Sequence, residues 1–532
     1  MKNMKGITLI ALVVTVIVLL ILAGISISVL TGNNGIINQS KEGKDQTEIE
    51  EEKEMINTSV AQAIDDAALG NLKKDVLQNK LDENTGTGKT EVLGNENLMV
   101  VKFIETNRYY EIDGDGKITG PKELASDNNA GDISKGGQFD GSEDKPFQIN
   151  CIEDLVAFSI MSNGGNEDLN IQSNNFPGQY VNLMRSLDFQ SIFSYNDYKS
   201  KEFGDLNNDG TIEGIMAELT NTTEGCMGFT PIGDFRGILN GKNNSIENLY
   251  ENRTGKSGLF GTTSSGVILK DLTVTGKIIS TNYKVGGICA EANDATIINC
   301  HNKIEIIQSG KISSQNPRTG GIAGEAWGDT LIIDCSNEAN IESDSAVGGI
   351  VGVVDGKVIN CYNSGKITGK LGATYGAVGG IAGYSTGAEI YNCFNTGEIT
   401  NQNTGNNVYA TAGGIIGNSG QVGTNCKVIN SYNIGKVNYT KEGYGGIVGG
   451  YWYYNTDNTA TLNNTYYQED ADLLGYAKFS AAQGVEKKTR EYMHSNDLVL
   501  KLNDYIENNT DGIDTSEWKK WKLGENNYPI FE

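Results

Sequence analysis

One motif recurs through the middle of this chain and limits the folds that the chain can adopt. Residues 348–367 read GGIVGVVDGKVINCYNSGKI, and the same frame returns as GGIAGYSTGAEIYNCFNTGEI from Gly379 and as GGIAGEAWGDTLIIDCSNEANI from Gly320. Self-similarity at a period of this length is typical of stacked copies of one supersecondary unit. The sequence therefore predicts a repeat protein.

Alignment of the copies on their Asn-Cys pair gives columns of uniform chemistry. The Cys column holds small or apolar residues: Leu272, Cys300, Cys335, Cys361, Cys393 and Ser431. The columns three positions earlier and six positions later are aliphatic: Leu269, Ile297, Ile332, Val358, Ile390 and Val428, then Ile278, Ile306, Ile341, Ile367, Ile399 and Val437. The Gly-Gly-Ile block adds a further aliphatic column: Leu259, Ile288, Ile322, Ile350, Ile381, Ile415 and Ile447. The position before the Cys column is always Asp or Asn: Asp271, Asn299, Asp334, Asn360, Asn392 and Asn430.

These columns predict a parallel β-solenoid. Side chains of a strand alternate between its two faces, so apolar columns an odd three positions apart cannot both face inward on one straight strand. A bend must lie between them, at the Asn/Asp column, where each amide can hydrogen-bond to its equivalent in the next coil. The glycines serve another corner, which needs either φ > 0 or a close approach of backbones. Seven coils at ~4.8 Å each would stack to roughly 35 Å.

The cysteines of the repeat column are expected to be buried core residues and not disulfides. Leu272 and Ser431 take the same position, so no thiol is required there. Stacking also holds equivalent Cβ atoms ~4.8 Å apart, beyond the ~3.5–4.5 Å that a disulfide needs. The sequence does not fix the state of Cys151, Cys226 and Cys426, which lie outside the columns.

Composition excludes some functions. The net charge of −25 would repel phosphate, so nucleic acid is not an expected partner. The chain has two histidines, His301 and His494, which leaves little for histidine-based metal sites or catalytic triads. His301 aligns with Tyr362, Phe394 and Tyr432 in other copies. We therefore expect it to be a surface or packing residue and not a ligand.

The repeats resemble the GLUG motif, which occurs in bacterial surface proteins and in the non-catalytic part of some immunoglobulin-A-cleaving peptidases. Residues 228–261, GFTPIGDFRGILNGKNNSIENLYENRTGKSGLFG, are similar to the usual approach to such arrays, so the resemblance covers about residues 140–467. The stretch PFQINCIEDLVAFSIMSN is expected to form a helix that caps one open end. KTREYMHSNDLVLKLNDYI, with Trp518, Trp521 and YPIF, is expected to cap the last coil.

The N-terminal residues predict a membrane segment. No charged residue occurs from Ile7 to Leu30, which as a helix spans about 36 Å and exceeds the ~30 Å hydrocarbon core. Lys2 and Lys5 precede it and should stay in the cytoplasm, which places the bulk of the chain outside. A secretory signal peptide is the competing interpretation, but the apolar run is too long and no A-x-A site follows it.

The sequence KGITLIALVV resembles the prepilin-type signal of type IV pilins and pseudopilins. The resemblance implies cleavage by a prepilin peptidase between Gly6 and Ile7, N-methylation of Ile7, and assembly with other pilins. Pilins usually carry Glu at the fifth mature position, where it pairs with a neighbouring subunit's terminal amine; here that position is Ala11. The sequence therefore leaves filament formation open, and a plain signal anchor is the alternative interpretation.

The expected fold class is mainly β, with an N-terminal transmembrane α-helix, a small α+β head, a parallel β-solenoid and capping elements. TGNNG at 31–35 marks a turn, and a helical pattern resumes near Ile36 and ends near Gly70. NLMVVKFIETNRYYEIDGDGKIT reads as strands joined by an Asp-Gly turn. The predicted segments are a leader (1–6), a transmembrane helix (7–30), a pilin-like region (31–130), the solenoid start with its N-terminal cap (131–256), the GLUG-type solenoid (257–467) and a C-terminal cap (468–532).

DLNNDGTIE is the candidate calcium site. Asp205, Asn207 and Asp209 alternate, with Gly210 at the sharp turn, as in a calcium loop. The twelfth position is Met216, so the closing bidentate Glu is missing. The interpretation of a polar surface turn stays open beside that of a Ca²⁺ site. DGDGK, residues 113–117, also lacks the closing Glu and is better explained as a hairpin turn.

The variable connections between copies suggest a binding surface. QSGKISSQNPRT, GKLGATYGAV and NQNTGNNVYATA leave the same corner of each coil, with Tyr375 and Tyr409 near their tips. Polar loops with aromatic residues suit carbohydrate or protein contact, although unconstrained loops would read alike. GGYWYYN at 449–455 fits a binding patch or a cover for the solenoid end.

Two function classes follow. The first is a non-catalytic, membrane-anchored surface protein that displays the solenoid for adhesion or binding, as a minor or tip pilin, with carbohydrate or a host or cell-surface protein as partner. The second is a β-helix enzyme acting on surface polysaccharide. The enzyme would need carboxylates converging with Arg or Lys on one face, whereas the repeated columns carry Asn, Gly and Ile.

Overall fold

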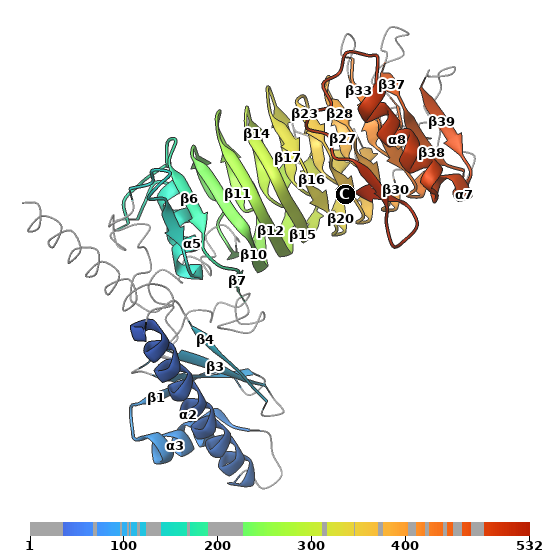
Figure 1. Ribbon diagram of the computed structural model, residues 1–532. Helices are drawn as coiled ribbons and strands as arrows, with labels where there is room; N and C mark the ends of the chain where they lie inside the picture. Colours follow the sequence, from blue (N-terminus) through green and yellow to red (C-terminus); the bar gives the residue numbers. More distant parts are fainter. Residues whose placement is uncertain are drawn as a thin grey trace, which may run out of the picture. The chain divides into compact units, whose positions relative to one another are not determined.

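The computed structural model divides into two compact units, Met1–Ser126 and Asp127–Glu532, which are described separately (Figure 1). The structure describes residues 36–66, 72–95, 98–103, 106, 108–113, 117–123, 140–166, 171–189, 227–310, 317–344, 346–370, 376–402, 411–420, 425–439, 444–450, 460–469 and 484–532. The predicted transmembrane segment 7–30 and the processing residues Gly6 and Ile7 lie outside these ranges. Within them, no helix combines the length and apolar character needed to cross a membrane.

The first unit combines two helices with a four-stranded antiparallel sheet. Its elements are α2 (Ile36–Asp66), α3 (Lys74–Thr85), β1 (Thr90–Asn95), β2 (Leu98–Phe103), β3 (Arg108–Asp113) and β4 (Ile118–Glu123), and the strands pair in chain order. Ile56 on α2, Leu77 on α3 and Val101 on β2 share one apolar core. Helix α2 covers residues for which a helical pattern was predicted, whereas α3 and β1 had no predicted counterpart. The relation of this unit to a pilin head stays a prediction.

The second unit is a parallel β-solenoid of about eight turns (Figure 1). One face is a seven-stranded parallel sheet: β9 (Ile232–Phe235), β11 (Phe260–Thr263), β14 (Cys289–Asn293), β17 (Ala323–Trp327), β22 (Val351–Val354), β27 (Ala382–Ser385) and β32 (Ile416–Asn418). A second face has six strands: β13 (Lys284–Gly286), β16 (Arg318–Gly320), β21 (Ala346–Gly348), β26 (Ala377–Gly379), β31 (Thr411–Gly413) and β36 (Tyr444–Gly445).

The third side begins with long strands that later coils break into three short ones. The long strands are β10 (Ile238–Arg253), β12 (Ile268–Ser280) and β15 (Thr296–Gln308). The first short row is β18 (Leu331–Ile333), β23 (Lys357–Ile359), β28 (Glu389–Tyr391), β33 (Lys427–Ile429) and β37 (Thr461–Asn463). The second is β19 (Ser336–Asn337), β24 (Tyr362–Asn363), β29 (Phe394–Asn395), β34 (Tyr432–Asn433) and β38 (Thr465–Gln468), and the third is β20 (Ile341–Ser343), β25 (Ile367–Gly369), β30 (Ile399–Asn401) and β35 (Val437–Tyr439).

The predicted aliphatic columns are confirmed as stacked, buried rows. Ile341 pairs with Ile367, Ile367 with Ile399, and Ile399 with Val437, all in parallel register. The column that contains Ile332 and the Gly-Gly-Ile column enter the same core. No single coil buries its apolar side chains alone, so the coils depend on one another for stability.

The predicted bend at the Asn/Asp column is also confirmed. All six residues have φ between 49° and 58°, the left-handed region that Asn and Asp tolerate better than other non-glycine residues. The Asn360, Asn392 and Asn430 amides form a ladder, with Nδ2–Oδ1 distances of 2.8 Å from Asn392 to Asn360 and 2.7 Å from Asn430 to Asn392. Asp334 accepts from Asn360 at 2.9 Å, but a carboxylate has no proton to donate onward. The His301 ring nitrogen instead lies 3.1 Å from Asn299 Oδ1.

A second asparagine ladder lies inside the solenoid. The amides of Asn302, Asn337, Asn363, Asn395 and Asn433 are linked side chain to side chain at 2.7–2.8 Å. Each amide packs against the second glycine of a Gly-Gly pair. A Cβ added to Gly349 would lie 2.2 Å from the Gly380 oxygen and 2.4 Å from Asn363 Cγ, and its φ is not left-handed. Of the two reasons predicted for the glycine pair, close approach is therefore the one that applies.

The cysteines of the repeat column are buried and free, as expected. Backbone N–H groups of Cys335 and Cys361 each lie 3.4 Å from the Sγ of the next cysteine along the stack. Cys426 is also free and buried, and so is Cys289, which belongs to no predicted column; Cys151 is buried. Cys226 lies outside the described residues.

Short elements close the N-terminal end of the solenoid. These are β5 (Phe147–Ile149), α5 (Ile152–Ser162), β6 (Tyr180–Leu183), β7 (Leu187–Asp188) and β8 (Met227–Gly228). Phe158 of α5 lies edge-on to Phe176 and Phe235, at ring distances of 4.8 and 5.3 Å. The helix expected from PFQINCIEDLVAFSIMSN therefore packs on the first coils.

The C-terminal segment, defined here as residues 484–532, differs from a simple end cap. Its elements are β39 (Val485–Lys488), α7 (Arg490–Met493), α8 (Asn496–Asn508), β40 (Trp521–Leu523) and β41 (Pro529–Phe531). Strand β39 pairs with β38. Residues from α8 onward instead pack along the side of several coils, as the red ribbon in Figure 1 shows.

Candidate functional site

The loop-bearing edge is the first candidate surface, defined as the connections that join the row of β15, β20, β25, β30 and β35 to the row of β16, β21, β26, β31 and β36. Both rows stack in register, so every connection leaves and returns at the same edge of the solenoid. The connection from β20 to β21 has two residues, whereas the one from β25 to β26 has seven. The predicted tip residues Tyr375 and Tyr409 lie outside the described residues, as do 451–459.

The calcium prediction is not tested by the geometry. Asp205, Asn207 and Asp209 all lie outside the described residues. In the part of the chain that is described, no three His, Cys, Asp or Glu side chains gather in a way that would hold a metal ion.

A cluster of charged side chains lies where the first two sheets meet. Lys284 Nζ is 2.8 Å from the Glu291 carboxylate and 2.9 Å from that of Glu325, which is 1% exposed. Lys256 also reaches Glu291, at 2.7 Å, and Arg318 pairs with Glu325. Burial opposes ionisation of Glu291, but hydrogen bonds from Lys256 and Lys284 outweigh it and lower its pKa. Glu291 is therefore an ionised carboxylate held by cations and not a proton donor.

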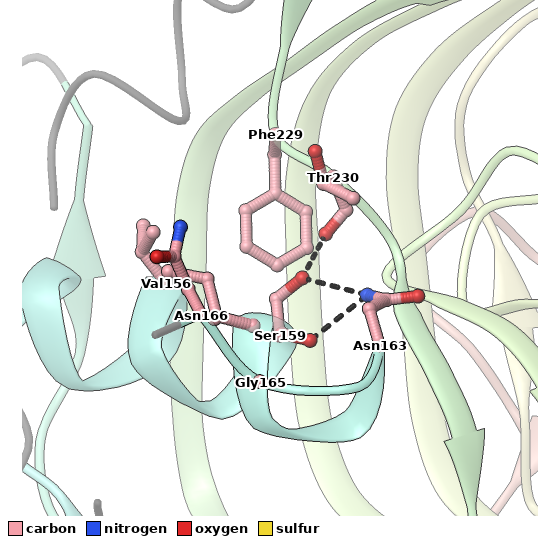
Figure 2. Close-up of a pocket in the computed structure, with 8 residues that line it drawn as sticks. Val156, Ser159, Asn163, Gly165, Asn166, Phe229 and Thr230 are labelled. Carbon is pink, nitrogen blue, oxygen red and sulfur yellow. Dashed lines mark hydrogen bonds between the residues drawn. The ribbon is translucent and has the colours of Figure 1, made fainter. Parts of the chain in front are cut away.

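A small cavity of about 110 Å³ lies between the cap helix α5 and the first coils (Figure 2). Ser159 Oγ donates to the Thr230 carbonyl at 2.6 Å, and Asn163 Nδ2 donates to the Ser159 carbonyl at 2.8 Å. Phe229 forms an apolar wall. The Ser159 hydroxyl, the Asn163 amide and the Thr230 carbonyl therefore bind one another and fix the cap helix on the first coils.

The C-terminal segment is held on the solenoid by hydrogen bonds to the asparagines of the bend ladder. Asn360 Nδ2 donates to the Glu517 carbonyl at 2.7 Å, and Asn360 Oδ1 accepts from Lys519 N at 3.1 Å. One coil further, Asn392 Nδ2 donates to the Lys519 carbonyl at 2.9 Å, and its Oδ1 accepts from Trp521 Nε1 at 2.7 Å. The ladder therefore recognises an extended backbone.

Two outward-facing columns lie beside this contact, and the tryptophans pack against them. The first contains Tyr362, Phe394 and Tyr432, and the second contains Ile359, Tyr391 and Ile429. Phe394 stacks between Tyr362 and Tyr432 at 5.0 and 5.2 Å, and Trp521 lies 5.7 Å from both Phe394 and Tyr432. Trp518 packs in the second column with Tyr391, at 5.4 Å. Where the segment ends, the first column becomes polar: Thr273, His301 and Ser336.

A long groove separates the coils from the turn at residues 511–517. A cavity of about 720 Å³ is lined by Leu331, Lys357 and Glu389 on the coils and by Asp514 on the segment. An adjoining cavity of about 550 Å³ continues toward Thr461. Both are open to solvent on the same side of the solenoid.

Comparison with known protein families supports the repeat assignment. The GLUG motif matches residues 343–368 and 374–400. Search of curated proteins finds no significant match to the chain. Those two matched copies span β20 to β30, and the stacked columns continue on both sides of them.

The sequence predicted the aliphatic and Asn/Asp columns, but it did not predict the inner Asn ladder, the charged cluster or the groove. The inner Asn ladder had a sequence signal, because the second position after the Cys column is Asn from Asn302 to Asn433. The charged cluster and the groove join residues outside the repeated columns. The resemblance to a prepilin signal stays a prediction.

Proposed function

We propose that this chain is a membrane-anchored, pilin-like bacterial surface protein whose solenoid binds carbohydrate or another surface protein through its loop-bearing edge. A GLUG-type β-solenoid fits a surface-displayed β-helix protein. The observation that carries the binding role is the register of the two strand rows, which brings connections of unequal length to one edge. Binding loops on a rigid scaffold are a common arrangement of recognition surfaces.

The test of this edge is a loop exchange. Residues 370–376, between β25 and β26, are replaced by Asp344–Ser345, the two residues that join β20 to β21. The strands on both sides have the same register, so the coil should still form. We expect the full chain to bind ligands on a glycan array or on cells and the exchanged chain to bind more weakly. Equal binding, with unchanged circular dichroism, contradicts the role of the edge.

Anchoring and processing are proposals from the N-terminal sequence. Gly6→Val should block maturation by a prepilin peptidase, whereas the wild-type chain should be shortened by it. Unchanged migration of both chains after exposure to the peptidase supports a plain anchor. Labelling of cells with an antibody to residues 257–467 distinguishes fibres from an even surface coat.

A β-helix enzyme acting on polysaccharide is the second candidate. The Glu291–Glu325 cluster favours it, since carboxylates there meet Lys and Arg on one face. The lowered pKa of Glu291 argues against a role as general acid, which calls for a raised one. Turnover of any glycan that the array identifies, lost in Glu291→Gln, would replace the binding role by catalysis.

A further inference from the structure

The groove beside the C-terminal segment is long and straight because its floor follows a stacked column. Leu331, Lys357, Glu389, Lys427 and Thr461 are consecutive partners in parallel register. Four intervals at ~4.8 Å give a floor of roughly 19 Å. An extended chain rising ~3.3 Å per residue would place about five or six residues along it.

The floor carries one carboxylate between two lysines, which leaves it with a net charge of +1. Glu389 lies between Lys357 at 3.3 Å and Lys427 at 2.7 Å. Burial opposes ionisation of Glu389, but its contacts with the two lysines outweigh this and lower its pKa. The charged groups of the floor pair with one another, and the four carboxylates of the walls outnumber the one excess lysine, so the groove as a whole is negative.

Both walls carry acidic side chains without a cation. Asp329 and Asp355 lie on the coil turns, and Asp514 and Glu517 lie on the C-terminal segment; all four are exposed. None of them forms an ion pair with another residue of the described ranges, whereas many other acidic side chains of the solenoid do. Carboxylates facing each other across a groove attract a cationic ligand.

The aromatic residues of the groove favour a peptide over a sugar chain. Tyr391 is 5% exposed and Trp518 is 6% exposed, and each packs against the other. Among the described residues of the groove, these two therefore present no flat aromatic face to a sugar ring. Lys and Arg side chains, by contrast, reach carboxylates on either side of an extended backbone.

We propose that this groove binds an extended peptide segment of another protein that carries Lys or Arg side chains. The site is separate from the loop-bearing edge and does not depend on the function proposed for it. The backbone lies along the column from Leu331 to Thr461, and its basic side chains pair with Asp329 and Asp355 on one wall and with Asp514 and Glu517 on the other.

Hexalysine, labelled with a fluorophore, is the probe, and its anisotropy is measured with the full chain. We expect binding that weakens as the salt concentration rises, because the pairs are solvent-exposed. The variant Asp355→Asn/Asp514→Asn removes one carboxylate from each wall and should bind roughly 3- to 10-fold more weakly. Neither side chain is buried, so the fold should be unaffected.

The matched control is Glu305→Gln/Glu342→Gln, which removes two exposed carboxylates from β15 and β20, outside the groove. It should bind hexalysine like the wild type. An equal loss in both variants would reduce the effect to the overall charge of −25 and overturn the proposal. A glucosamine oligomer that displaces hexalysine at equal concentration would assign the groove to an amino sugar chain instead. Photo-crosslinking of a benzophenone-labelled probe only to residues that line neither cavity of the groove would also overturn it.

Discussion

Asn392 joins the bend ladder to the C-terminal segment, and its replacement by alanine tests both. Asn392 has no exposed surface and makes four side-chain hydrogen bonds of 2.7–2.9 Å, to Asn360, Asn430, Lys519 and Trp521. Its φ is 54°. The alanine variant therefore removes a junction between three coils and the segment, and also leaves a Cβ in a left-handed backbone.

The magnitude follows from the groups left behind. Nδ2 of Asn430 and Nε1 of Trp521 each lose their acceptor in a buried place, at about 1–3 kcal/mol apiece. Alanine in the left-handed region adds about 1 kcal/mol. We expect Asn392→Ala to lower the free energy of unfolding by about 3–7 kcal/mol. Asn392→Gly, which relieves the backbone term, should lose about 1 kcal/mol less.

The assay is urea unfolding of the full chain followed by tryptophan fluorescence. Trp518 and Trp521 lie against the coils and report release of the C-terminal segment, whereas Trp327 on β17 reports unfolding of the solenoid itself. Asp271→Ala is the matched control, because Asp271 also has a left-handed φ of 58° but its side chain accepts a single ladder bond within the described residues, from Asn299 Nδ2 at 2.9 Å. If Asn392→Ala were no more destabilising than Asp271→Ala, the ladder would not be what holds the segment.

Three further outcomes are expected. Ile367→Lys places an unpaired charge in the apolar core and should unfold neighbouring coils, visible as a lost or lowered circular dichroism melt. Burial raises the pKa of Glu251 to about 8, above its usual 4.5, so the folded state holds its proton more tightly than the unfolded state. The contribution of Glu251 to stability is complete below about pH 4.5 and is lost as the pH rises through about 8. Glu251→Gln keeps an acceptor for Gly258 N, so between pH 4.5 and 8 the melting temperature of this variant should rise relative to that of the wild type. Gly349→Ala should destabilise the solenoid, because its Cβ would overlap Gly380 and Asn363, whereas Gly255→Ala, with open space around its Cα, should melt like the wild type.

The aliphatic columns were predictable because a strand allows one simple rule. Side chains alternate, so Ile332 and Cys335 can both face inward only if the chain bends at Asp334. The structure has that bend, with φ of 58° at Asp334. Stacking of the coils then follows, because the backbone N–H and C=O groups of one coil need hydrogen-bond partners in the next coil.

The lateral position of the C-terminal segment was not predicted, although the sequence of the coils that it covers carries a signal for it. The outward position after the Cys column changes from His301 and Ser336 to Tyr362, Phe394 and Tyr432. Aromatic side chains facing out of several successive coils indicate a cover on that side. The charge of the groove could not be predicted in the same way, because its two walls are more than a hundred residues apart in sequence.

The two asparagine ladders explain why the register of the coils is fixed while their core is interchangeable. Apolar contact alone is a weak constraint, because aliphatic residues such as Ile367 and Ile399 would still face the core after a shift of two positions. The amides of the inner ladder do not tolerate such a shift. Asn363 donates to Asn395 and accepts from Asn337, so both hydrogen bonds are lost together when its coil shifts. The ladder also requires glycine beside it, so a shifted coil would drive a side chain into Gly349 or Gly380. The regular spacing of the loop-bearing edge and of the groove depends on this register. A solenoid with an apolar core alone would not hold either surface in place.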